Sequence, residues 1–310
     1  MKAKNAETKV GTGGQNGWAG WGRAVCLAAA VCLAGAMTGC AKGPQTPADV
    51  WAKLGPGKKA GQTKKLKLPG GAKMEMVWCP PGTFLMGSPE TEEGRTESEV
   101  LHPVTLTEGF WMAKTEVTQK QWQSVMGTTI RQQRKKVNER RGTDWKENGS
   151  GAKHPICFVD WEECQEFCRK AGVSLPTEAE WEYACRAGST GAYAGTGDLD
   201  KMGWYHAAKN KKEGASHPVA KKKPNTWGLH DMHGNVQEWC EDWFGDYPIV
   251  AVTDPTGPAW GSYRVLRGGA GYGFPKEDGR RSCRSASRAF TDPKRAYSDM
   301  GFRPVARRPK

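Results

Sequence analysis

The chain has 310 residues, which is long enough to bury one large hydrophobic core or two small ones. It combines 40 glycines and 14 tryptophans with only 37% hydrophobic residues, which disfavours a helical bundle and favours a loop-rich structure held by aromatic side chains. The net charge of +13 indicates either a basic, soluble surface or an anionic partner such as a sulfated or phosphorylated glycan, and no recognised motif supports nucleic-acid binding.

The N-terminal segment has the pattern of a signal peptide. Basic residues precede an apolar stretch over residues 24–40, which is too short to span a bilayer comfortably. The stretch ends in MTGC, which resembles a bacterial lipobox whose cysteine, Cys40, receives the lipid. Residues 1–40 are therefore expected to be a signal peptide with a lipobox-like end. Export would either attach a lipid to Cys40 or remove the segment by ordinary cleavage. The protein is expected either in the bacterial cell envelope as a membrane-anchored lipoprotein or outside the cell after ordinary cleavage.

Export changes how the cysteines are interpreted, because disulfides persist in an oxidising compartment. An odd number of cysteines remains after Cys40, so at least one thiol stays unpaired within a monomer. The remaining cysteines are Cys79, Cys157, Cys164, Cys168, Cys185, Cys240 and Cys283.

Beyond Cys40, the composition divides the chain into a tether and one domain. Residues 41–71 are rich in lysine, glycine and proline and are expected to be the tether. Residues 72–308 are expected to form an α+β domain with few short helices and much irregular backbone. From Met74, the sequence MEMVWCPPGTFLMGS predicts a strand, a turn and a second strand, and residues 102–118 predict further strand structure.

Three short helices are indicated by the residues at their ends. The first and third begin at Thr118 and Thr177, each followed three residues later by the partner of a capping box, and the second begins at Asp160. Residues 131–153 are strongly basic with little apolar content, so we expect a solvated insertion loop there.

Three motifs then occur in a particular order. They are LPTEAEWEYACRAG, WGLHDMHGNVQEWCEDWF, and RVLRGG followed by CRSASR and GFRPV. In this order and spacing they resemble the formylglycine-generating enzyme family, also called sulfatase-modifying factor domains, and the resemblance covers nearly all of residues 74–305. It implies a fold with little regular structure, related to C-type lectins and stabilised by calcium. The best-known members oxidise a sulfatase cysteine to formylglycine with copper and oxygen.

The sequence DMHGNVQEW also has the features of a cation site. Hard cations prefer several oxygens, and a tight turn presents backbone carbonyls beside acidic side chains. Asp231 and Glu238 offer carboxylate or carbonyl oxygens, Gly234 and Val236 offer carbonyls, and the family's calcium loop uses these four positions. The alternative is a Gly-Asn turn without an ion.

The positions that carry the family's chemistry differ in this chain. In active members a glycine pair is followed by a serine and then by two cysteines, whose thiolates are soft ligands for copper(I). Here the glycine pair is followed by Ala270, and no cysteine occurs before Cys283. The tryptophan that active members carry before the EW of the calcium loop is Gln237. We therefore expect no catalytic residues of the family's kind and no copper.

Cys283 lies in a cluster of arginines, which leaves two interpretations. Nearby cations lower a thiol pKa and would make it a reactive thiolate, or the cysteine is one half of a disulfide. The resemblance implies the second, with Cys185 as the partner. The arginines are Arg280, Arg281, Arg284 and Arg288.

Other potential metal ligands carry weaker signals. Cys164 and Cys168 are one helical turn apart, but we expect core or disulfide cysteines there because no matching pair is apparent. His230 and His233 flank the proposed calcium loop and are expected to be surface residues rather than ligands.

Two functions remain in competition. The first is a binding or structural module for a peptide, a protein or an anionic glycan, which is favoured by the missing thiol pair and the basic surface. The second is a divergent oxidase acting on a sulfatase cysteine, which is supported by the scaffold alone.

Overall fold

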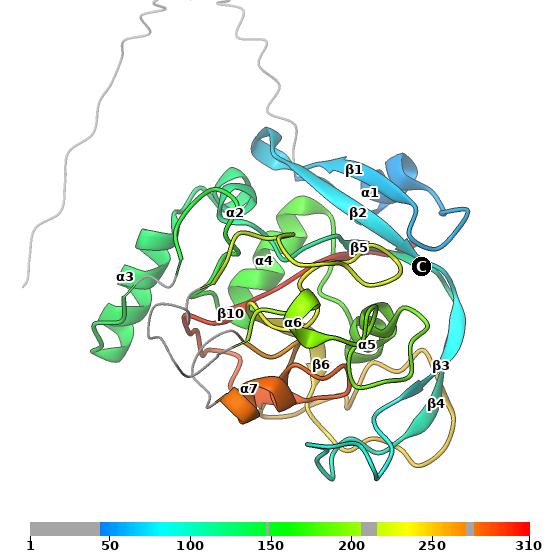
Figure 1. The fold of residues 1–310 in the computed structure, drawn as a ribbon. Helices are drawn as coiled ribbons and strands as arrows, with labels where there is room; N and C mark the ends of the chain where they lie inside the picture. The colour runs from blue at the N-terminus through cyan, green and yellow to red at the C-terminus, as the bar shows by residue number, and fades with distance from the viewer. Residues whose placement is uncertain (1–43, 147–148, 206–215, 271–275) are drawn as a thin grey trace, which may run out of the picture. The chain divides into compact units, whose positions relative to one another are not determined.

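The computed structural model describes residues 44–146, 149–205, 216–270 and 276–310, and its strands form three small sheets (Figure 1). The first sheet is antiparallel, in the order β1 (Thr63–Lys67), β2 (Lys73–Cys79), β5 (Phe110–Ala113), β11 (Val305–Ala306). The second has the order β10 (Met300–Gly301), β6 (Gln237–Trp243), β8 (Arg264–Arg267), β9 (Ala289–Thr291). The third has the order β3 (Gly82–Met86), β4 (His102–Leu106), β7 (Val252–Thr253).

The three helices predicted from their caps are present. They are α2 (Gln119–Met126), α4 (Trp161–Ala171) and α5 (Glu178–Arg186). Each begins after a capping box in which the cap side chain and the third helical residue bond to each other's backbone N–H. The described residues also form the short α6 (Leu199–Met202) and α7 (Lys276–Ser282), besides two helices that were not predicted. The expected α+β class with short helices is confirmed.

The expected tether is wrong for much of its length, because residues 47–71 belong to the folded domain. They form α1 (Pro47–Leu54), β1 and a single 3-10 turn, η1 (Pro69–Gly71). Val50, Leu54 and Leu66 are buried in the same core cluster as the tryptophans of β2 and β5. The segment is rich in lysine, and its few apolar residues are easily overlooked in the sequence. Their burial holds α1 and β1 against the domain, where Figure 1 shows them beside β2.

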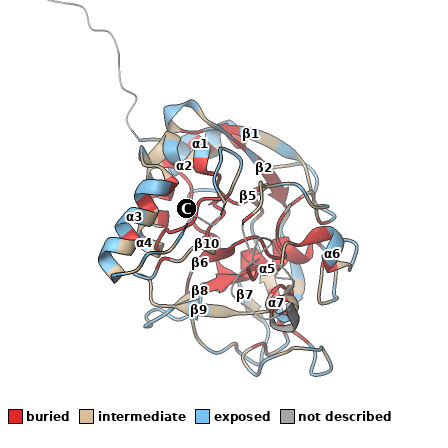
Figure 2. Cartoon of the chain, turned by 60° about the vertical axis from the view of Figure 1, so that its left-hand side comes forward, coloured by how far each residue is buried: buried red, intermediate tan, exposed pale blue. Residues whose placement is uncertain are grey.

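The expected insertion loop is also wrong, because it contains the helix α3 (Ile130–Arg141). Thr129 and Gln132 form a capping box, and Gly142 ends the helix in the left-handed conformation. Ile130 and Val137 are two turns apart and are both buried, while most of the surrounding charged side chains remain exposed (Figure 2). One narrow apolar stripe was enough to dock a strongly basic helix.

Large aromatic side chains fill the interior, as the composition indicated. The indoles of Trp111, Trp122, Trp181 and Trp239 are fully buried. One core cluster gathers around α4, and another packs α5 against β2, β5 and β6. Within the described residues, no helix is long and apolar enough to cross a membrane.

Candidate functional site

Helix α5, which carries the first of the three sequence motifs, is buried along its whole length (Figure 2). The residues that were predicted as functional are described from this helix outward. Its three glutamates each meet an arginine from a distant segment, since buried carboxylates need charged partners. Glu178 binds Arg288 at 2.8 Å, Glu180 binds Arg307 at 2.6 Å, and Glu182 binds both Arg186 and Arg267. The arginines of the C-terminal motifs therefore neutralise and position α5.

The arginines around Cys283 are likewise occupied by carboxylates. Arg284 binds Glu99 and Glu92, each at 2.7 Å, and Arg288 binds Glu178. Burial raises the pKa of the Cys283 thiol to about 12, so the paired arginines do not produce a thiolate. This environment favours a neutral thiol at Cys283 over a reactive thiolate.

The predicted disulfide between Cys185 and Cys283 is not formed in the structure. Both residues are buried and carry free thiols, as do the other five cysteines after Cys40. The Cys185 Sγ lies 3.7 Å from the Ser285 Oγ and 3.8 Å from the His233 Nε2, and burial raises its pKa to about 12. The Cys185 and Cys283 thiols are nevertheless close enough to interact electrostatically.

The backbone at the glycine pair is compact and requires glycine. Gly268 and Gly269 have φ values of 92° and 69°, and a Cβ on Gly269 would lie 2.6 Å from the Ser282 carbonyl oxygen. Ala270 is fully buried. Gln237 is buried on β6, where its Nε2 donates to the Asp299 Oδ2 at 3.3 Å. Ala270 and Gln237 therefore contribute to the packing of the domain.

The predicted calcium loop adopts an unusual backbone. Asp231 has a φ of 58° and Gly234 a φ of 108°, and a Cβ on Gly234 would lie 2.0 Å from the Trp204 carbonyl oxygen. The Asp231 Oδ2 accepts a hydrogen bond from the Ala220 N–H at 2.7 Å, whereas its Oδ1 is buried without a partner. Burial raises the pKa of Asp231 to about 6. The loop therefore presents an unsatisfied carboxylate oxygen to the interior.

Glu116, which the sequence reasoning missed, supplies a second such oxygen. Its Oε1 accepts from the Asn235 Nδ2 at 3.0 Å, while its Oε2 is buried without a partner. Burial and the neighbouring Asp231 carboxylate raise its pKa well above the usual range. A glutamate inside an apolar strand-like segment was the signal available in the sequence, because such residues are almost never buried without a role.

The carboxylate of Glu238, a predicted cation ligand, is already bound to an arginine. Its carboxylate binds the Arg303 guanidinium at 2.7 Å and accepts from the Trp181 Nε1 at 2.6 Å. Within the described part of the chain, no group of three or more His, Cys, Asp or Glu side chains is arranged to hold a metal ion. A cation beside Asp231 and Glu116 would therefore need backbone carbonyls, such as those predicted at Gly234 and Val236.

His233 was expected at the surface, and this expectation is wrong. The ring is buried, with its Nδ1 2.8 Å from the Cys283 carbonyl oxygen and its Nε2 accepting from the Ala194 N–H at 3.0 Å. Burial lowers its pKa to about 4, so the ring stays neutral and joins the backbone at Cys283 and Ala194 to the predicted calcium loop.

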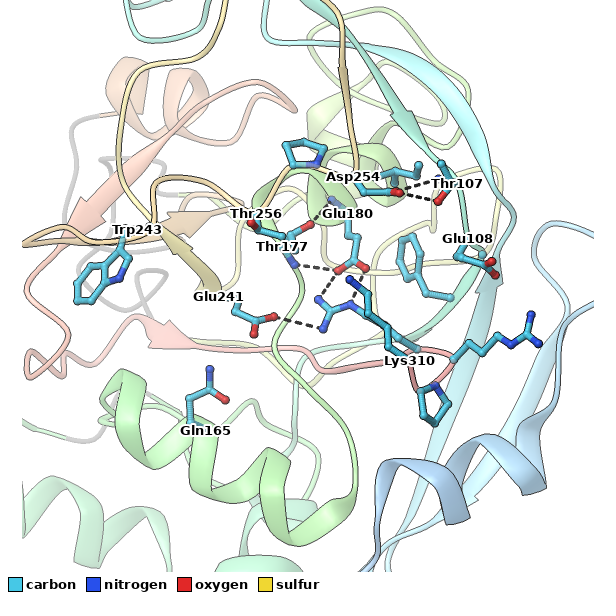
Figure 3. Close-up of a pocket in the computed structure, with 18 of the residues that line it drawn as sticks. Thr107, Glu108, Gln165, Thr177, Glu180, Glu241, Trp243, Asp254, Thr256 and Lys310 are labelled. Atoms are coloured by element: carbon cyan, nitrogen blue, oxygen red, sulfur yellow. Dashed lines mark hydrogen bonds and ion pairs between the residues drawn. The ribbon is translucent and has the colours of Figure 1, made fainter.

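A cavity of about 820 Å³ lies beside the N-terminus of α5, and Glu180 and Arg307 are among the residues that line it (Figure 3). In Figure 3, Glu180 and Glu241 converge on the Arg307 guanidinium, and Asp254 bonds to Thr107 on the opposite side. A second cavity of about 350 Å³ adjoins it, and the two share Trp243 and the loop that follows β7. None of the site residues predicted from the sequence lines either cavity.

Arg264 lines this cavity and stacks between two tryptophans. The centre of its guanidinium lies 3.8 Å from the ring centre of Trp161 and 3.5 Å from that of Trp243. One Nη1–H donates to the Glu241 carbonyl oxygen at 2.5 Å, and the Nε is buried without a partner. Burial lowers the pKa of Arg264.

Cys40, the predicted lipidation site, lies outside the described residues. The comparisons with known proteins concern the domain that follows it. The model of the sulfatase-modifying factor enzyme 1-like domain matches residues 63–308.

The chain is similar to proteins of several kinds. It is 34% identical to a serine/threonine-protein kinase pkn1 of Chlamydia caviae, over 74% of this chain and 37% of the kinase. It is 37% identical to a formylglycine-generating enzyme of Streptomyces coelicolor, over 48% of this chain and 52% of that enzyme. The chain thus spans about a third to a half of the length of these curated relatives.

Solved structures resemble the fold over most of this chain. Treponema denticola variable protein 1 matches with a TM-score of 0.63 and 28% identity, over 79% of this chain and 99% of that one. PvdO from Pseudomonas aeruginosa matches with a TM-score of 0.62 and 26% identity, over 81% of this chain and 99% of that one. The expected formylglycine-generating-enzyme-like fold is confirmed.

Proposed function

This chain belongs to the family of sulfatase-modifying factor enzyme 1-like domains, and from that premise we propose that it binds a ligand rather than oxidising a sulfatase cysteine. The observation that carries the proposal is the state of the thiols. All seven cysteines of the described residues are buried, and burial raises the pKa of each. A soft-metal oxidase needs accessible thiolates as ligands, and no cysteine lines either cavity.

The binding domain is proposed to be exported and held at a bacterial membrane by a lipid on Cys40. This part of the proposal rests on the apolar stretch and the MTGC sequence of residues 24–40. The partner would then be a peptide, a protein or an anionic glycan outside the cytoplasm.

Calcium is proposed as the structural cation of the domain. The support is the pair of buried oxygens without hydrogen-bond partners, Asp231 Oδ1 and Glu116 Oε2. Together with Glu238 these two carboxylates share the single Arg303 guanidinium, and such an excess of buried negative charge suits a hard cation. The Gly234 and Val236 carbonyls would complete the site. The Glu238 carboxylate stabilises the loop through Arg303 instead.

A divergent oxidase is the alternative function, because the family includes formylglycine-generating enzymes. The deciding experiment incubates the purified chain with copper, a reductant and a cysteine-containing sulfatase peptide, and measures the aldehyde product by mass spectrometry. We expect no aldehyde above the level of a protein-free control. An active formylglycine-generating enzyme serves as the positive control on the same peptide.

A Cys283→Ser variant sharpens the same experiment. Aldehyde produced by the unmodified chain but not by this variant would show that Cys283 acts as a catalytic thiol, and the binding proposal would be wrong.

A further inference from the structure

The ion pairs of the buried arginines make Arg264 stand out. Arg267, Arg284 and Arg303 are fully buried, and each binds one or two carboxylates. Arg264 lines the cavity of Figure 3, yet no carboxylate within the described parts of the chain forms an ion pair with it. The carboxylates of Asp242 and Glu241 attract its guanidinium without forming a close ion pair. A partly desolvated cation of this kind can gain a direct ion pair from an anionic ligand.

The two tryptophans hold this guanidinium in a defined position. Trp161 is itself fixed, because its Nε1 donates to the Cys240 carbonyl oxygen at 2.9 Å. Trp243 packs closely against Gly261, where any Cβ would lie 3.0 Å from the Trp243 Cβ. Since the planar guanidinium stacks on aromatic faces, its N–H groups remain directed outward from its edge. The Nε is buried and the Nη1 already donates to the Glu241 carbonyl oxygen, so the donors left for a carboxylate or sulfate are the remaining N–H groups of the two Nη atoms.

The rest of the cavity wall combines hydrogen-bond acceptors with the cations Arg307, Arg308 and Lys310. Glu108 and Asp254 are exposed at the cavity, and Glu241 is half-exposed beside Arg264. Gln165 and Thr256 add neutral polar groups, and Figure 3 shows these side chains distributed around the opening. Ionised carboxylates only accept hydrogen bonds, so they suit a ligand with many hydrogen-bond donors. A saccharide is such a ligand, because nearly every carbon carries a hydroxyl.

We infer that the cavity binds an anionic saccharide, with Arg264 meeting its carboxylate or sulfate group and the acidic residues accepting from its hydroxyls. The apolar wall of Leu106, Phe110 and the two tryptophans suits the C–H faces of sugar rings. A volume of about 820 Å³ is in the range that holds a small oligosaccharide. This inference rests on the proposed binding function and names its ligand class.

The test measures binding of a heparin-derived tetrasaccharide to the full chain by isothermal titration calorimetry. We expect saturable binding that weakens with salt, because exposed parts of the charge interaction are screened. Neutral cellotetraose should bind at least about tenfold more weakly, since it lacks the anionic group. Equal binding of the two saccharides, or no binding of either, would overturn the inference.

Variants at two arginines locate the site. Arg264→Gln should weaken binding of the heparin tetrasaccharide by about 10- to 100-fold, because it removes a charge-assisted pair of hydrogen bonds. Arg295→Gln is the matched control, since Arg295 is exposed and does not line the cavity, and it should change the affinity by no more than about twofold. The same loss in both variants would mean that only net charge matters, and the site would be refuted.

A measurement on the unmodified chain covers the case in which Arg264→Gln does not fold. Phenylglyoxal modifies accessible arginines, and peptide mapping gives the rate at Arg264. The heparin tetrasaccharide should slow modification of Arg264 but not of Arg295. Unchanged modification of Arg264 at saturation would contradict the inference.

Two further outcomes separate this inference from its premise. Binding of a phosphoserine peptide with no binding of the saccharide would retain a binding function and reject the saccharide. Formation of aldehyde in the oxidase assay would reject the binding function itself, whatever the calorimetry shows.

Discussion

At the scale of single residues, the same side chain has different roles because its surroundings differ. Arg303 and Arg267 are buried against glutamates and stabilise the fold, as the short bonds of Arg303 to Glu238 illustrate. Arg264 is stacked between two indoles without a carboxylate and is available to a ligand. The printed sequence shows three arginines of the same kind, and only their neighbours distinguish them.

Asp299 allows a test of burial at this scale. Burial raises its pKa to about 6, so the folded state holds a proton that the unfolded chain releases near pH 4. Its ionisation therefore destabilises the fold increasingly from about pH 4 to 6, and the penalty is complete above that. Asp299→Asn should raise the free energy of unfolding by about 1–2 kcal/mol at pH 8 and leave it nearly unchanged at pH 4.

Urea unfolding at both pH values measures this difference. Asp246→Asn is the control, because Asp246 is exposed and its replacement should give no pH-dependent change. A stabilisation by Asp299→Asn that is equal at pH 4 and pH 8 would show that burial of the charge is not its cause.

At the scale of elements, α5 is the part of the fold on which the distant segments converge. Its first turn is capped by Thr177 and Glu180. Its buried glutamates bind Arg267 of β8, Arg288 of the CRSASR motif and Arg307 near the C-terminus. Glu182 additionally accepts from the Gly87 N–H at 2.9 Å, which joins the end of β3 to the helix. The helix therefore serves as a charged core around which irregular segments are ordered.

Removing one α5 charge should be costly. Glu182→Gln leaves Arg186 and Arg267 buried with incomplete compensation, so we expect the free energy of unfolding to fall by about 3–5 kcal/mol. Glu166→Gln on α4 is the matched control, because Glu166 pairs with Arg169 at the surface and should have no measurable effect. Chemical denaturation of both variants provides the comparison, and equal losses would show that the α5 network contributes nothing particular.

At the scale of the whole molecule, the fold consists of small sheets and irregular loops, and we propose that bound calcium stabilises it. Asp231 and Glu116 come from segments far apart in the chain, so a cation between them would join those segments. A ligand that binds only the folded state stabilises it by about 2.7 kcal/mol at one hundred times its Kd.

Calcium should therefore raise the Tm of the unmodified chain by several degrees. Asp231→Asn and Glu116→Gln should abolish this response, while Asp198→Asn, at an exposed position, should retain it. Without calcium, the first two variants should be at least as stable as the unmodified chain, because they no longer bury an unpaired charge. Differential scanning calorimetry with and without a chelator measures both effects. A calcium response that persists in Asp231→Asn would contradict the site.

The sequence by itself determined the local features of this protein. The caps at Thr118, Asp160 and Thr177 predicted three helices correctly, because a capping box needs only residues three apart. The ordered motifs indicated the family, which the match of the family model over residues 63–308 confirmed. Composition misled where a few apolar residues decide the outcome, as in α1 and α3.

Only the tertiary structure decided which charges are paired and where a ligand can enter. The partners of each arginine, the meeting of Glu116 with Asp231, and the stacking of Arg264 between Trp161 and Trp243 all join residues that are distant in the chain. No local pattern encodes such contacts, because they depend on how separate elements pack and on the burial that results. The net charge had already suggested an anionic partner, but the cavity that is proposed to bind it became apparent only in the folded molecule.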